Sequence, residues 1–179
     1  MSHNKLRAGA ISCLLLSFFG QTVVAQESVA VGTMTAAIDG DAYAGQTIDI
    51  PSQGTSTAEF RATGPVMSVS IQAHATEAES VMQDVMVVEF MLMGAGGAPN
   101  PMTPSVSWWP EGMNAPFFQS DEGGTAEVTL DTLSLDDPAS ATGSFVATLC
   151  RKDGFFAEAD TSDCRAVEGR FETALREGS

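Results

Sequence analysis

The chain of 179 residues carries a formal net charge of −15, with 23 Asp and Glu side chains against eight Lys and Arg. A protein this acidic is repelled by phosphate backbones and anionic headgroups, so nucleic acid and anionic membrane surfaces are excluded as expected partners. When the N-terminal segment described next is set aside, the remaining chain has the length of one domain, which is large enough to bury a core.

The first 25 residues have the pattern of a secretory signal peptide. A basic start precedes an apolar run from Ala8 to Phe19, which is too short to span a membrane. Cys13 lies inside this run rather than at a cleavage site, which argues against a lipid anchor. We therefore expect an exported protein, periplasmic or extracellular, whose residues 26–179 form one domain without a membrane span. This mature segment keeps all 23 acidic side chains and six of the basic ones, for a formal charge of −17.

Seven segments between residues 29 and 135 have the composition and patterning of β-strands, and Gly, Pro or Asp turn signals separate most of them. These segments are Val29–Ile38, Tyr43–Ile50, Thr57–Ala62, Val66–Ala75, Asp84–Met93, Val106–Trp109 and Thr125–Leu135. The sequence Asp39-Gly40-Asp41 predicts a tight hairpin between the first two. A change of alternation before Leu133 predicts a β-bulge in the last.

Two of these patterns predict where side chains lie. Strict alternation from Val66 to Ala75 places His74, the only histidine of the mature chain, on the solvent face. Both faces of Asp84–Met93 are apolar, which predicts a central strand covered on both sides. The Gly- and Pro-rich stretch from Gly94 to Gly124 predicts a long irregular region, where function is often located.

Two further strands occupy Ala141 to Leu175 and are joined by a loop. If Cys150 and Cys164 lie opposite each other in an antiparallel pair, alternation gives one apolar face and one mostly polar face. Both cysteines then fall on the solvent side. The same register sets Phe145 across from Gly169, where the ring covers bare backbone.

Two side chains of this hairpin, Val146 and Arg165, do not fit the alternation. The two mature cysteines still favour a disulfide over a metal-thiolate site, because such a site normally needs further Cys or His ligands. We therefore predict a surface disulfide between Cys150 and Cys164.

About nine short strands, with no amphipathic helix beyond the signal peptide, indicate an all-β domain. A single antiparallel β-sandwich closed by the disulfide-bonded hairpin is the simplest architecture, and a small β-barrel is the alternative.

The order of several short motifs resembles that of small exported bacterial β-sandwich families of unknown function. The motifs are Ile38-Asp39-Gly40-Asp41-Ala42-Tyr43, Met67-Ser68-Val69-Ser70-Ile71, Gly124-Thr125-Ala126-Glu127-Val128-Thr129-Leu130, Thr142-Gly143-Ser144-Phe145 and Glu168-Gly169-Arg170-Phe171. The resemblance covers most of the mature chain and implies the fold. It carries over no catalytic residue, and the disulfide is not part of the family pattern.

Aromatic doublets are the main candidates for a ligand or partner patch: Trp108 with Trp109, Phe117 with Phe118, and Phe155 with Phe156. A doublet in a strand sends one ring to each side, so one tryptophan can face outward. The alternative is that both tryptophans close an open end of the domain.

Metal binding is the second functional hypothesis. Oxygen-rich turns at Asp39 with Asp41 and at Asp136 with Asp137 are weak Ca²⁺ candidates, although none has EF-hand spacing and aspartate also favours turns by itself. A third acidic group surrounds the cysteines, and several methionines with His74 could hold Cu(I). Methionine in a strand more often fills a core. The methionines are Met82, Met86, Met91, Met93, Met102 and Met113.

Catalysis is the third hypothesis. No Gly-x-Ser-x-Gly motif exists, the thiols are expected to be paired, and carboxylate pairs are present by chance in so acidic a chain. We assign no catalytic residue and no cofactor. The sequence favours a non-catalytic binding or interaction module of the cell envelope or exterior, whose partner is an envelope protein or a glycan.

Overall fold

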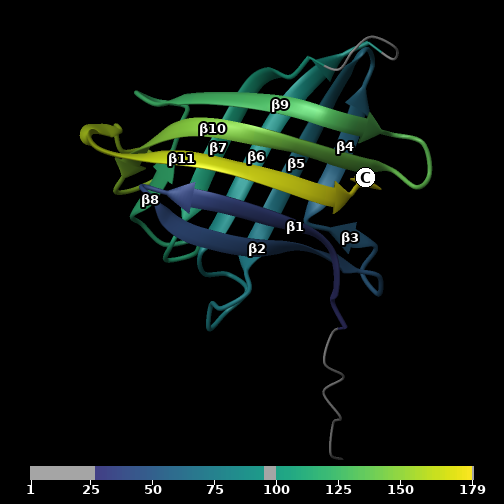
Figure 1. Ribbon diagram of the computed structural model, residues 1–179, viewed down its shortest axis with the longest axis horizontal. Helices are drawn as coiled ribbons and strands as arrows, with labels where there is room; N and C mark the ends of the chain where they lie inside the picture. The colour runs from purple at the N-terminus through teal and green to yellow at the C-terminus, as the bar shows by residue number, and fades with distance from the viewer. Residues whose placement is uncertain (1–26, 95–99, 179) are drawn as a thin grey trace, which may run out of the picture.

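The computed structural model describes residues 27–94 and 100–178, and every regular element in these ranges is a β-strand (Figure 1). The predicted signal peptide lies outside the described residues. The twelve strands are β1 (Val29–Ile38), β2 (Asp41–Ile50), β3 (Thr55–Ser56), β4 (Ala58–Thr63), β5 (Val66–Ala75), β6 (Val85–Met93), β7 (Met102–Trp109), β8 (Phe117–Gln119), β9 (Thr125–Ser134), β10 (Ser140–Lys152), β11 (Asp160–Ala174) and β12 (Arg176–Glu177). The expected all-β class is confirmed.

The strands form one large, mostly antiparallel sheet in the order β12-β4-β5-β6-β7-β8-β10-β11-β1-β2-β3, with β9 beside β10. The path also returns on itself, because β2 pairs with β5 through Gly45 and Gln46. Figure 1 shows β9, β10, β11, β1 and β2 lying across β4, β5, β6 and β7. The short strand β8 connects the two groups through its pairing with both β7 and β10.

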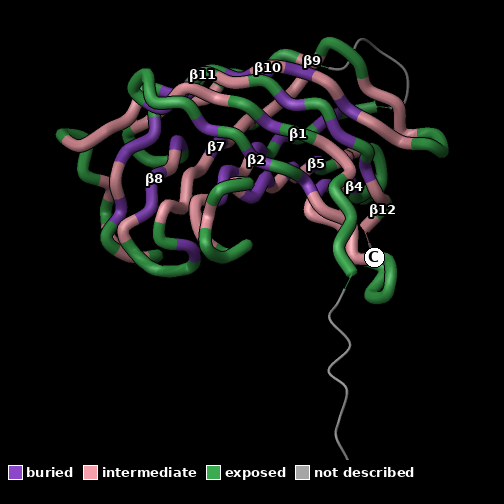
Figure 2. Tube along the Cα trace, turned by 60° about the horizontal axis from the view of Figure 1, so that its bottom comes forward, coloured by how far each residue is buried: buried purple, intermediate pink, exposed green. Residues whose placement is uncertain are grey.

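The hydrophobic core draws on both groups of strands. Buried and exposed positions alternate along the strands, while the turns are mostly exposed (Figure 2). The largest fully buried side chains include Met34, Ile71, Met86, Phe90, Phe145 and Leu149. Burying aliphatic and aromatic side chains of this size stabilises a domain by about 1.5–3 kcal/mol each.

The first hairpin has the turn that its sequence predicts. Asp39 and Gly40 both have positive φ, at 51° and 94°, which is the conformation that a two-residue turn between twisted strands requires. The Asp39 carboxylate also accepts a hydrogen bond of 2.8 Å from the backbone N–H of Ala166 in β11. β1 therefore lies between two strands, β2 of the first hairpin and β11 of the C-terminal hairpin.

The C-terminal hairpin has the predicted register. Cys150 pairs with Cys164 and Phe145 pairs with Gly169, and a disulfide joins the two cysteines. A side chain at Gly169 would begin 2.4 Å from Cζ of Phe145, so the ring does occupy the space above that glycine. The predicted β-bulge in β9 is also present, since Asp131 has no partner between Thr132 and Leu130.

Three short strands were not predicted, namely β3, β8 and β12, because a segment of two or three residues shows no periodicity. The expectation for β6 was wrong in part. The strand is central, with β5 on one side and β7 on the other, but only one face is fully covered. Met91 and Met93 on its outer face are 45% and 66% exposed, whereas Phe90 and Leu92 are buried.

The expectation for His74 was wrong as well. Its side chain does point away from the core, but it is only 7% exposed because the loop between β5 and β6 folds over it. The ring Nδ1 donates a hydrogen bond to the backbone carbonyl of Val81 in that loop. Backbone hydrogen bonds from Ala75 to Asp84 and from Thr76 to Ala44 hold the loop in place. Alternation gives the direction of a side chain, not what covers it.

Tyr43 is the only tyrosine of the chain, and it lies where β2 meets β5. It is 5% exposed, and its hydroxyl donates a hydrogen bond of 2.8 Å to the carbonyl of Ala73. Burial, and secondly the negative charge of Asp84, raise the pKa of this phenol far above its ordinary value. Ionising it therefore requires opening of the structure around it.

This environment predicts a delayed alkaline titration of Tyr43. In urea the phenol should ionise near pH 10, whereas in the native protein it should stay neutral there and ionise only in a cooperative unfolding step at higher pH. The folded pKa is raised, so the contribution to stability is complete below pH 10 and is lost as the pH rises above it. Phenolate absorbance and circular dichroism, followed together, test this. Ionisation near pH 10 in protein that is still folded would contradict it.

Candidate functional site

The aromatic doublets at the end of β7 and in β8 lie side by side. Trp108 pairs with Phe118 in the antiparallel register, so alternation places Trp109 and Phe117 on the opposite face. The Trp109 and Phe117 rings are stacked, with centroids 4.2 Å apart and planes inclined by 12°. The Trp108 and Phe118 rings also stack, at 5.3 Å. Each doublet thus sends one ring to each side of the sheet, as predicted.

A third aromatic side chain joins the outer pair from the loop between β10 and β11. The Phe155 centroid lies 5.7 Å from that of Trp109 and 5.5 Å from that of Phe117. Phe155 is 58% exposed, and the adjacent Phe156 is fully exposed. We call Trp109, Phe117 and Phe155 the outer aromatic cluster. Two neighbouring strands and a loop distant in sequence therefore form one aromatic cluster, in which Phe117 is buried, Trp109 is half-buried and Phe155 is exposed.

The inner pair has a different environment. The indole Nε1–H of Trp108 donates a hydrogen bond of 2.6 Å to the carboxylate of Asp84. The guanidinium of Arg165 lies over the Phe118 ring, 4.9 Å from its centroid, which is a cation–π contact. This contact explains why Arg165 departs from the alternation of β11. Trp108 and Phe118 close the end of the core, which is the alternative role considered for the tryptophans.

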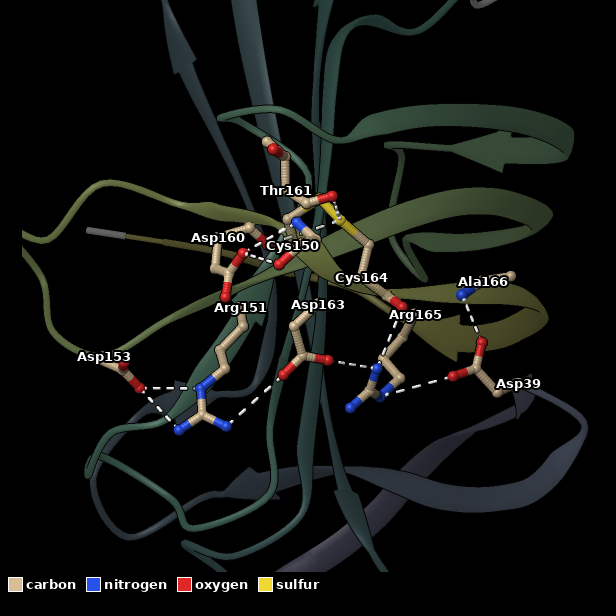
Figure 3. Close-up of polar contacts among 11 residues, drawn as sticks. Asp39, Cys150, Arg151, Asp153, Asp160, Thr161, Asp163, Cys164, Arg165 and Ala166 are labelled. Atoms are coloured by element: carbon tan, nitrogen blue, oxygen red, sulfur yellow. Dashed lines mark hydrogen bonds and ion pairs between the residues drawn. A yellow bond between two sulfur atoms is a disulfide. The ribbon is translucent and has the colours of Figure 1, made fainter.

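A chain of ion pairs holds the loop that carries Phe155 (Figure 3). Arg151 contacts Asp153 at 2.9 Å and Asp163 at 3.6 Å, so its side chain bridges the two sides of the loop. Arg165 continues the chain from Asp163, at 2.6 Å, to Asp39, at 3.5 Å. Exposed ion pairs contribute less than about 1 kcal/mol each, so they orient the loop more than they stabilise the fold.

Two charged side chains of this loop and its flanking strands have shifted pKa values. The hydrogen bond and charge of Asp153 raise the pKa of the Arg151 guanidinium further. Asp160 accepts hydrogen bonds from the hydroxyl of Ser162, at 2.6 Å, and from its backbone N–H, at 2.9 Å, and these lower the pKa of the Asp160 carboxyl. Both side chains therefore stay charged across the physiological pH range.

The disulfide is less exposed than predicted. Cys164 is half-buried, but Cys150 is fully buried although it lies on the outer face of β10. The turn between β8 and β9 covers it, with the carbonyl oxygen of Gly123 3.5 Å from its sulfur. Gly124 allows this approach, because a Cβ there would lie 2.2 Å from the carbonyl oxygen of Thr148.

Lys152, at the end of β10, is buried by the same turn. It is 4% exposed, and its Nζ donates a hydrogen bond of 2.9 Å to Glu122 in the same turn. The turn therefore covers both Cys150 and Lys152.

Further apolar side chains are exposed on neighbouring loops. The sequence did not single out Val81, and it indicated Met82 and Met113 only as possible copper ligands. Val81 and Met82, between β5 and β6, are 61% and 48% exposed, and Met113, between β7 and β8, is 64% exposed. The two loops touch, since a Cβ on Gly112 would lie 2.2 Å from the carbonyl oxygen of Met82. The signal available was an apolar residue inside an otherwise polar loop. We define the apolar loop surface by these residues, the exposed Phe155 and Phe156, and the half-buried Trp109 on which Phe155 packs. Its members are Val81, Met82, Trp109, Met113, Phe155 and Phe156.

The structure does not favour the acidic turns as metal sites. Asp39 already accepts the Ala166 N–H and contacts Arg165. Asp136 and Asp137 lie in the turn after β9. Within residues 27–94 and 100–178, no three His, Cys, Asp or Glu side chains are grouped as a metal ion would need. Calcium binding stays a prediction without structural support.

Met91 and Met102 do not converge with His74 on a copper site. Met91 and Met102 face each other across β6 and β7, on the outer surface. His74 lies opposite Val85, six residues away from Met91 along β6, which corresponds to roughly 20 Å. A Cu(I) site would need these thioethers and the imidazole within about 2–3 Å of one ion.

Comparison of the chain with profiles of protein families, with curated proteins and with solved structures found no match.

Proposed function

We propose that this chain is an exported, non-catalytic binding module of the cell envelope or exterior, built as an antiparallel β-sandwich, and that it contacts its partner through the apolar loop surface. The observation that carries the proposal is the pair of exposed rings Phe155 and Phe156, of which Phe155 packs on the half-buried Trp109. Large apolar rings held at the surface are typical of protein and ligand contacts.

Preorganisation of the rings supports a binding role. Two hydrogen-bonded strands fix Trp109 and Phe117, and the disulfide with its neighbouring ion pairs fixes the base of the loop that carries Phe155. A surface that is ordered before binding avoids much of the entropy that a flexible loop loses on association. An envelope protein and a glycan are both suitable partners, because aromatic faces pack against either.

The environment of the reactive side chains supports a non-catalytic role. His74 is the only histidine after the predicted signal peptide, and the loop between β5 and β6 covers it. Cys150 and Cys164 are joined to each other. The side chains that acyl-transfer chemistry commonly uses as base and nucleophile are therefore unavailable, because the histidine is covered and the two cysteines are joined in a disulfide.

Export rests on the signal-peptide pattern and on the disulfide. Disulfides persist in oxidising compartments and are rare in the cytosol. The described ranges hold no helix that is both long enough and apolar enough to cross a membrane.

Trp109→Ala and Phe156→Ser test the proposed surface. Binding to a glycan array and to immobilised envelope proteins would be compared with that of Val146→Ser, which changes an exposed apolar side chain on β10, outside the apolar loop surface. A tryptophan at the centre of a contact contributes about 2 kcal/mol or more, so Trp109→Ala should weaken binding by roughly thirtyfold. Phe156→Ser should weaken it less, and Val146→Ser should leave it unchanged. Wild-type affinity in both loop variants would refute the proposal.

A further inference from the structure

We infer that the partner of the apolar loop surface is a cationic amphipathic polypeptide segment, in which Lys or Arg side chains alternate with apolar ones. This inference rests on the proposed function and specifies the chemistry of its partner. It follows from the charges that surround the apolar side chains.

The basic side chains near this surface are already neutralised. Lys152 contacts Glu122, Arg151 contacts Asp153 and Asp163, and Arg165 contacts Asp163 and Asp39. None of these cations is left to attract an acidic partner. Their ion pairs also leave the surrounding carboxylates in excess.

Each loop of the surface adds at least one exposed carboxylate that pairs with no cation among the described residues. Glu77 and Glu79 accompany Val81 and Met82, Glu111 accompanies Met113, and Glu158 accompanies the Phe155 doublet. Apolar and acidic side chains therefore alternate over three adjoining loops. A segment with apolar and basic side chains complements this arrangement.

A hollow of about 550 Å³ brings two of these loops together. Glu77 and Glu79 line it from one loop and Glu111 from the next, with Tyr43 and Pro110 among the less polar walls. A Lys or Arg side chain suits such a hollow, because its aliphatic stem packs against apolar walls while its charged head meets the carboxylates. The volume lies within the range of small-ligand sites, so it leaves room for a long basic side chain.

Other occupants fit the charges less well. A neutral ligand on this surface would partly desolvate carboxylates without providing a counter-charge, which is unfavourable. A second copy of this chain would bring two sets of unpaired carboxylates together. Phosphate-bearing lipids and nucleic acids are repelled by the same groups.

Three synthetic peptides of equal length and equal apolar content test the inference, with Lys, Gln or Glu at the polar positions. Fluorescence anisotropy would give the dissociation constants for the full-length mature protein at low and at physiological salt. The Lys peptide should bind at least about tenfold more tightly than the Gln peptide, and the preference should shrink as salt rises. The Glu peptide should bind most weakly of the three.

Two matched triple variants separate local charge from total charge. Glu77→Gln with Glu79→Gln and Glu111→Gln should remove the preference for Lys over Gln. Glu127→Gln with Glu168→Gln and Glu172→Gln, which changes the same number of exposed carboxylates on β9 and β11, should keep it. Equal losses in the two variants, equal affinities of the Lys and Gln peptides, or no binding of any peptide would overturn the inference.

The same titrations distinguish failure of the inference from failure of the proposed function. If the Lys and Gln peptides bind equally and Trp109→Ala weakens both, the binding surface stands and only the charge of the partner is wrong. If the Lys peptide binds wild type, Trp109→Ala and Phe156→Ser alike, the surface itself is wrong. Sedimentation should show a monomer, since self-association that Phe156→Ser abolishes would identify a second copy as the occupant and overturn the inference.

Discussion

Replacing Phe145 with alanine is expected to lower the free energy of unfolding by about 3–5 kcal/mol, which is typical of a buried phenylalanine. The side chain is 2% exposed, and its ring fills the space above Gly169 on the facing strand. Gly169 has no side chain that could occupy the space left by the ring. The substitution therefore leaves a cavity and also uncovers backbone at the centre of the longest hairpin.

Denaturant unfolding followed by circular dichroism measures this loss. Val146→Ala is the matched control, because Val146 follows Phe145 on the same strand but points to solvent and is 59% exposed. It should change stability by no more than about 0.5 kcal/mol. A loss below about 1 kcal/mol in Phe145→Ala would show that the ring does not pack on Gly169 as described.

Removing the disulfide by Cys150→Ala with Cys164→Ala is the second large effect, a loss of about 3 kcal/mol. The two cysteines are 14 residues apart, and the bond stabilises mainly by restricting the loop between them in the unfolded chain. The fold itself should persist, since the pairing of β10 with β11 continues far beyond the cysteines. The loop with Phe155 should become the most mobile part of the hairpin.

Unfolding midpoints of the double variant, and of wild type with a reductant, measure this effect. Both should fall, because each removes the cross-link, and the double variant should fall somewhat further because it also removes the buried sulfur of Cys150. Hydrogen exchange should then rise chiefly in the segment between Arg151 and Asp163. An unchanged midpoint in the double variant would contradict the predicted stabilisation by the cross-link.

The register of the C-terminal hairpin could be predicted because two independent constraints agree on it. The cysteines fix which residues face each other, and Phe145 opposite Gly169 satisfies a packing requirement in the same register. The first hairpin was predictable for a related reason, since Asp39-Gly40 fits one turn type well. In both hairpins, the residues at the turn or at the facing positions were enough to predict which residues pair.

The burial of His74 and of Cys150 was not predictable, because both depend on loops that return over an outer sheet face. Alternation gave the correct side for each residue, but the covering segments come from the loop before β6 and the turn before β9. Met91 and Met93, by contrast, were predicted to be covered and are exposed. Their apolar character predicted a covering layer that the structure does not place there.

The candidate site was predictable only in its parts. Two doublets on neighbouring strands had to place one ring on each side, whereas the packing of Phe155 on Trp109 depends on the path of a loop. The loop contributions of Val81 and Met113 gave no periodic signal. The contact of Arg165 with Phe118 could have been inferred from one observation, a cation on the apolar side of its strand.

The enclosure of β1 between β2 and β11 has a consequence for how the protein reaches its folded state. The contacts of Asp39 with Ala166 and of Asp49 with Arg176 each join residues 127 positions apart, so the first hairpin keeps an open edge until the last long strand arrives. Domains dominated by such non-local pairing fold in about milliseconds to seconds, and an open strand edge can pair with another chain during that time. The formal charge of −17 over residues 26–179 makes unfinished chains repel each other. The acidity of the sequence thus serves the folding of this protein, before any partner is met.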